Sequence, residues 1–143
     1  MSKEKTLIIG GGQAACQTAT SLRSKGYNGE IKIYCSENYL PYQRPPLSKK
    51  FLLGELEKER LFFKPEKFYD ENDVSISLNS YVQGIDTKNK EIFLANNETE
   101  YYDNLVIATG TKARTIDTDK KISDKVFYLR SIDDVLSIRD KIK

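Results

Sequence analysis

Residues with the types and spacing of a phosphate-binding loop stand near the start of the sequence. Gly10, Gly12 and Ala15 fit the pattern G-x-G-x-x-G/A, between the apolar run LII and a segment of small residues. In this pattern the first glycine permits a tight turn, the second lets a pyrophosphate approach the backbone, and the third small residue lets helix and strand pack closely. The helix start offers free N–H groups to the anion. The pattern predicts a dinucleotide site, although a plain turn between strand and helix would use the same residues.

A carboxylate, Glu37, follows the next expected strand. Dinucleotide-binding folds carry an acidic residue near this position, where it accepts a hydrogen bond from the ribose 2′-hydroxyl. Such a charge disfavours a 2′-phosphate, which argues against NADP at this site. Glu30 is a poorer candidate because it precedes the strand. The alternative for Glu37 is a solvated loop charge.

Other catalytic chemistries are limited by composition. The sequence has no histidine, which excludes Ser-His-Asp and Cys-His catalysis and imidazole metal sites within it. Cys16 and Cys35 do not form a C-x-x-C pair, so we expect free buried thiols and no metal site. Chemistry must therefore use a cofactor, or lysine, carboxylate and tyrosine side chains.

The bulk composition is that of one globular domain. The 143 residues carry a net charge of +2, with 38% hydrophobic and 31% charged residues. The dispersed charges indicate neither nucleic-acid binding nor a membrane surface. The apolar runs are all shorter than the ~18 residues of a spanning helix. We therefore expect a cytoplasmic protein.

The elements that must position the glycine loop alternate between strand and helix. Apolar runs predict strands at 7–9 and 31–34, and helical spacing predicts a helix over 13–25. Short helices are expected over 47–53, after the prolines and closed by Gly54, and over 65–71.

The pattern changes from Val74 onward. Alternating segments and turns from there to the NNE turn at 96–98 predict an antiparallel meander. The segment NLVIATG then predicts a strand buried on both faces of a parallel sheet. A polar linker leads to a helix that begins after Ser131 and turns Ile132, Val135, Leu136 and Ile142 inward. The fold class is α/β: a Rossmann-like parallel sheet with an antiparallel meander insertion.

The sequence resembles ferredoxin-reductase-type flavoproteins of the pyridine nucleotide-disulphide oxidoreductase superfamily. This group includes reductases of dioxygenase systems, putidaredoxin and rubredoxin reductases, and apoptosis-inducing factor. The resemblance runs from LIIGGGQAACQTATSLR to VFYLRSIDDVLSIRDKI, and LPYQRPPLSK is its most specific part.

The resemblance implies that the glycine motif binds FAD. Glu37 would take the adenosine ribose, and Val82 would meet the adenine end through its backbone. Lys49 would lie near the flavin ring as the catalytic residue, where its ammonium would favour an anionic reduced flavin. Surface charges are the alternative for Arg44 and Lys49. The implied cofactor-binding residues are Gly10, Gly12, Gln13, Ala14, Ala15, Glu37, Arg44, Lys49, Val82, Ala108, Thr109 and Gly110.

The resemblance implies the first part of a FAD-binding domain over 1–115, and a linker with an amphipathic helix over 116–143. NAD(P)H would bind only through a domain missing from this sequence. The expected activity is an NAD(P)H-dependent reductase that passes electrons to a ferredoxin or rubredoxin-like acceptor. The alternative is a non-catalytic nucleotide-binding or interaction module. A sheet without its returning segment would leave apolar surface, to be covered by a complementing chain or by self-association unless the sequence is a truncated form.

Overall fold

The computed structural model describes residues 3–119 and 122–142. The chain forms two compact units. The first comprises Met1–Tyr42 and Phe62–Gly110, and the second comprises Gln43–Leu61 and Thr111–Lys143. Within the described ranges, no helix combines the length and apolarity needed to cross a bilayer.

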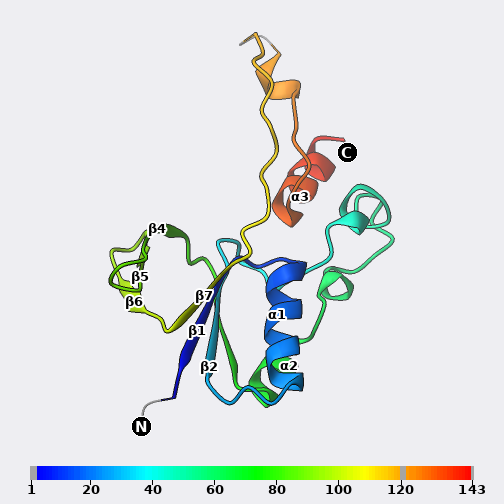
Figure 1. The fold of residues 1–143 in the computed structure, drawn as a ribbon. Coiled ribbons are helices and arrows are strands. Elements are labelled where there is room, and N and C mark those ends of the chain that lie inside the picture. The colour runs from blue at the N-terminus through cyan, green and yellow to red at the C-terminus, as the bar shows by residue number, and fades with distance from the viewer. Residues whose placement is uncertain (1–2, 120–121, 143) are drawn as a thin grey trace. The chain divides into compact units, whose positions relative to one another are not determined.

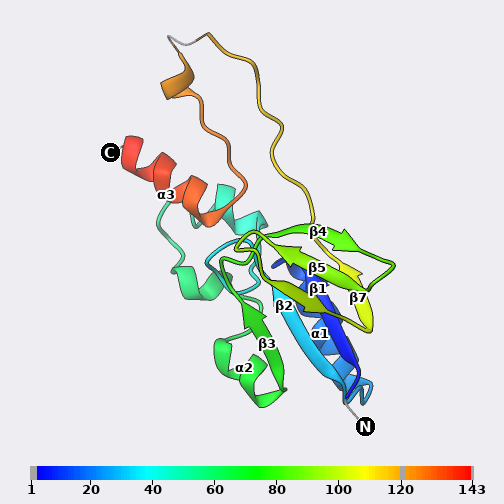
Figure 2. The same cartoon turned by 90° about the vertical axis from the view of Figure 1, so that its left-hand side faces the viewer.

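A four-stranded parallel sheet is the centre of the first unit. Its strands are β1 (Lys5–Ile9), β2 (Glu30–Tyr34), β3 (Val74–Ser77) and β7 (Asn104–Ile107), in the order β3-β2-β1-β7. All three neighbouring pairs are parallel (Figure 2). Because the strands run the same way, the loops that follow β2, β1 and β7 emerge at one edge of the sheet.

Two helices cover one face of this sheet and a small antiparallel sheet covers the other (Figure 1). The helices are α1 (Gln13–Ser24) and α2 (Glu66–Glu71), and the antiparallel strands are β4 (Val82–Asp86), β5 (Glu91–Leu94) and β6 (Thr99–Tyr101). Successive β1 side chains point to opposite faces. Ile8 therefore packs against the helices, whereas Leu7 and Ile9 join the cluster that includes Ile92 and Leu94. Burial on both faces explains why the second half of β1, Leu7 to Ile9, is a continuous apolar run.

The position of β3 differs from the sequence prediction. The alternating segment from Val74 was predicted to start the meander, but Ile31 pairs with Val74 and Ile33 with Ile76 in the parallel sheet. The meander comprises β4, β5 and β6 alone. Val74 and Ile76 pack on the helix side, where Val74 is buried, while Ser75 is exposed. In an edge strand with one covered face, apolar and polar residues alternate as they do in an antiparallel strand. The alternation therefore did not distinguish the parallel sheet from the meander.

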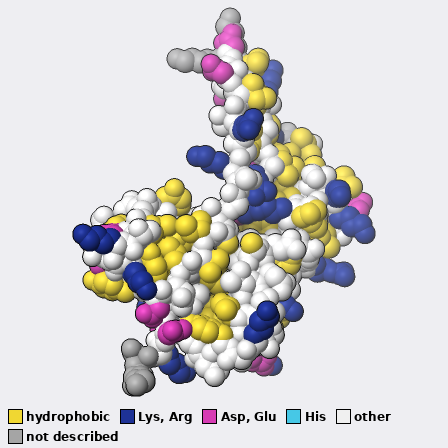
Figure 3. Space-filling view, in the orientation of Figure 1, with side chains coloured by type: hydrophobic (Ala, Val, Ile, Leu, Met, Phe, Trp, Pro, Cys, Tyr) yellow, Lys and Arg dark blue, Asp and Glu magenta, His cyan; other side chains and the backbone are white. Residues whose placement is uncertain are grey.

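The last strand, β7, is also less buried than predicted. It pairs with β1 as expected for a strand of the parallel sheet. Among the described residues, however, β7 is an edge strand, and Ile107 is 64% exposed. Hydrophobic side chains gather on the surface over β7 and the meander in Figure 3. The apolar run therefore predicted the correct sheet for β7. The predicted burial of both faces is not found among the described residues.

The second unit contains short 3-10 helices and one longer helix. The 3-10 helices are η1 (Pro45–Ser48), η2 (Lys58–Leu61) and η3 (Ser123–Lys125), and the α-helix is α3 (Ile132–Lys141). The helix predicted over 47–53 is wrong in type and bounds, because the prolines start a 3-10 helix that ends at Ser48 and turns follow up to Gly54. The predicted linker includes residues 120 and 121, and the predicted C-terminal segment includes residue 143, all of which lie outside the described residues.

The start of α3 was predicted correctly and its buried face only in part. Ser131 caps the helix, and Asp134 completes a capping box. Ile132 and Val135 are buried, but Leu136 and Ile142 are 40% and 71% exposed. The buried face of α3 in this unit is thus narrower than the apolar pattern suggests.

Candidate functional site: a glycine loop at the edge of the parallel sheet

The glycine loop joins β1 to α1. Gly10 has a φ of +125°, and a Cβ atom there would lie 2.1 Å from the carbonyl oxygen of Ala108. The Ala108 N–H donates to the Ile9 carbonyl at 2.7 Å, and the Gly10 N–H donates to the Tyr34 carbonyl at 2.9 Å. The turn is therefore held against the ends of both neighbouring strands, which leaves no room for a side chain at position 10.

Gly11 packs against the end of β2. A Cβ atom at this position would lie 2.8 Å from Cys35 Sγ. Cys35 is fully buried, and burial raises the pKa of its thiol to about 12, with a further contribution from the Glu37 charge. The neutral thiol therefore acts as a packing group beneath the loop. The G-x-G-x-x-G/A pattern does not specify the residue at position 11. The run of three consecutive glycines was the only sequence signal for a constraint at this position.

Gly12 presents bare backbone at the start of α1. It occupies the N-cap position in an extended conformation, and no side chain caps the helix. A Cβ atom at Gly12 would meet nothing within 4 Å. The first turn contains no acidic residue. A helix start with this geometry offers N–H groups and a positive dipole end to an anion, with open space for the anion to approach.

The three residues that follow Gly12 differ in burial and therefore in their roles. Ala15 is fully buried on the face of α1 that packs against the sheet, as the third small residue of the motif requires. Gln13 and Ala14 are exposed in the first turn. Ala15 therefore serves helix packing, while Gln13 and Ala14 provide the accessible backbone.

The segment after β7 reaches the same edge. Ala108 lies against Gly10, Thr109 follows it, and Gly110 has a φ of +66°. The small side chain at 108 and the positive φ at 110 let the backbone pass the glycine loop and then turn. Ala108 and the backbone nitrogen of Thr109, predicted separately from the glycine motif, are thus brought together with Gly10.

Glu37 is held by its own loop and by the loop after β3. Its Oε2 accepts a hydrogen bond from the Tyr42 hydroxyl at 2.5 Å. Its backbone carbonyl accepts from the Asn79 N–H at 3.2 Å, and the carbonyl of Cys35 accepts from the Ser80 N–H at 2.8 Å. Glu37 is half-buried and therefore differs from a freely solvated loop charge. Sequence reasoning missed Tyr42 and Asn79, because neither belongs to the fingerprint.

Val82 begins β4 and pairs with Leu94. Its half-buried side chain packs on the core cluster between the two sheets. A backbone contact from Val82 to a nucleotide stays a prediction.

Arg44 and Lys49 belong to the second unit. The Arg44 guanidinium donates through Nη1 to the Arg130 carbonyl at 2.7 Å. Lys49 follows η1, its N–H donates to the Pro46 carbonyl at 3.0 Å, and its side chain is exposed. Arg44 therefore fastens η1 to the segment before α3. The cofactor contacts predicted for both residues remain predictions.

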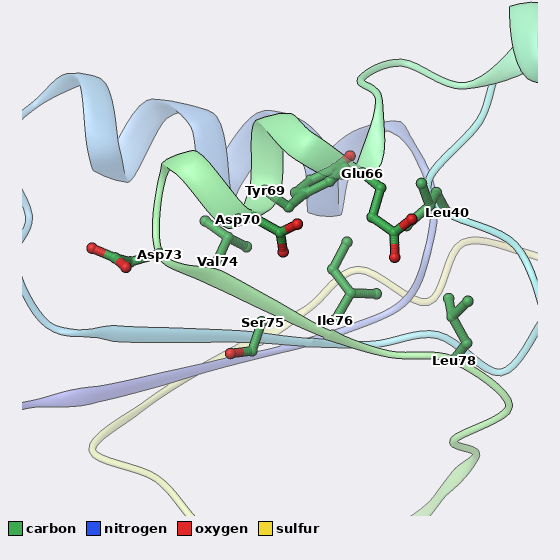
Figure 4. A pocket seen from close by; sticks show the side chains of 9 residues that line it. All are labelled: Leu40, Glu66, Tyr69, Asp70, Asp73, Val74, Ser75, Ile76 and Leu78. Carbon is green, nitrogen blue, oxygen red and sulfur yellow. The ribbon is translucent and has the colours of Figure 1, made fainter.

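A groove of about 400 Å³ lies elsewhere, between α2 and β3. Figure 4 shows Val74, Ile76 and Leu78 along one side of it, with Glu66 and Asp70 from α2 opposite. None of the predicted cofactor-binding residues lines this groove. In the described residues, no cluster of acidic side chains or cysteines has the geometry of a metal site. The groove is therefore separate from the glycine loop.

Comparisons with known proteins show the family to which the chain belongs. The family model for pyridine nucleotide-disulphide oxidoreductases matches residues 4–143. The rubredoxin-NAD(+) reductase of Pseudomonas putida is 40% identical over 136 residues, which cover 95% of this chain and 35% of that relative.

Solved structures give the same result. The ferredoxin reductase for the CYP199A2 system from Rhodopseudomonas palustris is 36% identical with a TM-score of 0.90, over 97% of this chain and 34% of that one. The covalent putidaredoxin reductase–putidaredoxin complex matches at 26% identity with a TM-score of 0.91, over 99% of this chain and 35% of that one. The chain thus spans about a third of the length of these relatives. Since the family model covers nearly all of its residues, the chain belongs to the pyridine nucleotide-disulphide oxidoreductase family.

Proposed function

We propose that this chain is the FAD-binding part of an NAD(P)H-dependent reductase whose electrons pass to a ferredoxin or rubredoxin-like acceptor. The observation that carries the proposal is Gly12, a bare N-cap at the uncapped start of α1 with open space before it. Relatives named rubredoxin-NAD(+) reductase and ferredoxin-NAD(P)(+) reductase support the reaction class.

The residues present fit a dinucleotide in type and arrangement. N–H groups of the first turn of α1, at Gln13, Ala14 and Ala15, would hold the pyrophosphate, for which Gly12 leaves room. Glu37 would accept from the ribose, and Ala108 to Gly110 would border the cofactor beside Gly10. Lys49 would hold a positive charge close to the flavin.

Bound FAD would supply the chemistry, because a flavin accepts two electrons together and releases them singly. The chain's own part is to bind and orient it. The sequence contains no second G-x-G-x-x-G motif. We therefore assign NAD(P)H binding to a segment outside this sequence. Separately, we propose a cytoplasmic location for the protein.

The first experiment is to purify the protein, pass it through gel filtration and titrate it with FAD. The expected result is flavin absorbance that co-elutes with protein and a saturable titration. Reduction of that absorbance by NADH or NADPH then tests the reductase activity of the whole protein. A protein that is folded by circular dichroism but binds no FAD would contradict the proposal.

A further inference from the structure

We infer that Tyr42 is a positioning residue for nucleotide recognition: its hydroxyl fixes the Glu37 carboxylate that reads the adenosine ribose. The inference rests on the proposed function and adds a residue to the site. It starts from the bond of 2.5 Å between Tyr42 Oη and Glu37 Oε2. Hydrogen bonds between a hydroxyl and a carboxylate are short and strong, and this length is in their usual range.

Tyr42 is itself firmly held. Its side chain is 2% exposed, and the Tyr39 ring meets its ring edge to face, with centroids 6.2 Å apart. Its backbone forms an isolated antiparallel bridge with Phe62, and the Phe63 N–H donates to the Pro41 carbonyl at 3.0 Å. Because the Tyr42 ring is buried and its backbone is hydrogen-bonded, the Tyr42 hydroxyl keeps one position. The Glu37 carboxylate bonded to it therefore loses rotamer freedom before a ligand binds.

The chemistry of the carboxylate leaves room for a ligand. An ionised carboxylate has about four acceptor positions, so a bond from Tyr42 is compatible with a further bond from a ribose hydroxyl. The Glu37 backbone is fixed separately by the Asn79 N–H. Backbone and side chain of Glu37 are therefore positioned by different elements. Such preorganisation lowers the entropy lost on binding, which is how a residue without ligand contact can raise affinity.

A structural role alone would give a different result. A buried tyrosine hydroxyl requires a partner, and Glu37 could serve merely as that partner. Removing the hydroxyl would then lower stability without changing which nucleotide is preferred. The discriminating readout is therefore the preference for ADP over 2′-deoxy-ADP, which isolates the 2′-hydroxyl and cancels general loss of structure.

We would measure the affinities of both nucleotides by competition with FAD in the wild type, Tyr42→Phe, Glu37→Gln and Tyr69→Phe. Tyr69→Phe is the matched control, because Tyr69 is also 2% exposed and bonds Cys16 Sγ at 3.3 Å, not Glu37. We expect the wild type and the control to prefer ADP by about five- to tenfold, the value of one good hydrogen bond. We expect Tyr42→Phe and Glu37→Gln to lose most of this preference.

Two outcomes would overturn the inference in different ways. A full preference for ADP in Tyr42→Phe, together with its loss in Glu37→Gln, would leave Tyr42 a packing residue and Glu37 the ribose acceptor. No preference in the wild type would remove the ribose role of Glu37 from the proposed function, and the inference with it. Glu37→Asp is a second variant that leaves Tyr42 intact. Because it withdraws the carboxylate by one methylene, it should lose the preference, and retention would also count against Tyr42.

Discussion

At the scale of single residues, three consecutive glycines serve three different purposes. Gly10 avoids a clash with the Ala108 carbonyl, Gly11 avoids the Cys35 sulfur, and Gly12 has nothing near it. The first two are thus required by the fold, while the third has no structural requirement for the missing Cβ. Only at Gly12 does the absence of a side chain point to a ligand.

Lys49 provides a test at the residue scale that does not depend on the glycine loop. If its ammonium lies near the flavin, Lys49→Ala should weaken flavin binding and make the two-electron reduction potential more negative, because a positive charge stabilises anionic reduced flavin. A loss of about 1.4 kcal/mol corresponds to about 30 mV for such a couple. The measurement is a spectroelectrochemical titration of the FAD-loaded protein.

Lys50→Ala is the matched control for this prediction, since Lys50 is also exposed and directly follows Lys49. An unchanged potential and affinity in Lys49→Ala would remove the role assigned to Lys49.

Among the candidate site residues, the sequence predicted the backbone geometry of those whose constraints are local. Gly10, Gly12 and Ala15 lie within one strand-turn-helix unit, so their spacing alone carries the requirement. The contact of Gly11 with Cys35 and the bond of Glu37 with Tyr42 join segments that the fingerprint does not describe. Such pairs depend on how the loops pack and could not be read from the pattern.

At the scale of elements, the start of α3 gives a prediction about pH. Burial of Asp134 opposes its ionisation, but N–H groups of Ser131 and Arg130 and the charge of Arg44 outweigh it and lower the pKa of Asp134. The folded pKa thus lies below the ordinary value of 3.8, so this carboxylate stabilises the fold above that value. The contribution is lost as pH falls through the folded pKa.

We therefore expect Asp134→Asn, which removes the charge that accepts the Ser131 and Arg130 N–H groups, to lower the free energy of unfolding by about 1 kcal/mol at neutral pH. The difference from the wild type should shrink under acid conditions below 3.8. Denaturant unfolding at both pH values measures this. Asp117→Asn, at an exposed carboxylate, is the control. An equal loss at both pH values would mean that the charge of Asp134 is not responsible.

Elements were predicted well where one pattern implied one environment. The buried β1 and β2 and the amphipathic α1 were found within two residues at each end. The strand β3 was placed in the wrong sheet because its alternation reports one covered face and not the direction of its neighbour. Arg23 illustrates what no pattern shows, since its guanidinium joins α1 to the carbonyls of Tyr27, Gly29, Asn72 and Asp73.

At the scale of the whole molecule, ligand binding at the edge of the parallel sheet has to be considered separately from the reaction of the whole protein. The described residues provide a parallel sheet whose central strands end at one edge, where open α/β sheets bind their ligands. The chain spans about a third of the reductases that it resembles, and exposed Ile107 lies on the edge strand β7. The fold of the described residues therefore supports FAD binding. Hydride transfer and recognition of the electron acceptor remain proposals for the whole protein.

The most direct test of the central claim compares FAD binding in the wild type and in Gly12→Ala. Because a Cβ atom at Gly12 meets nothing within 4 Å and its φ is −104°, we expect the free energy of unfolding without ligand to change by no more than about 1 kcal/mol. We expect FAD affinity to fall at least about tenfold, because the new methyl group would occupy the approach of the pyrophosphate. Unchanged FAD affinity in a stably folded Gly12→Ala protein would contradict the assignment of the glycine loop as the cofactor cradle.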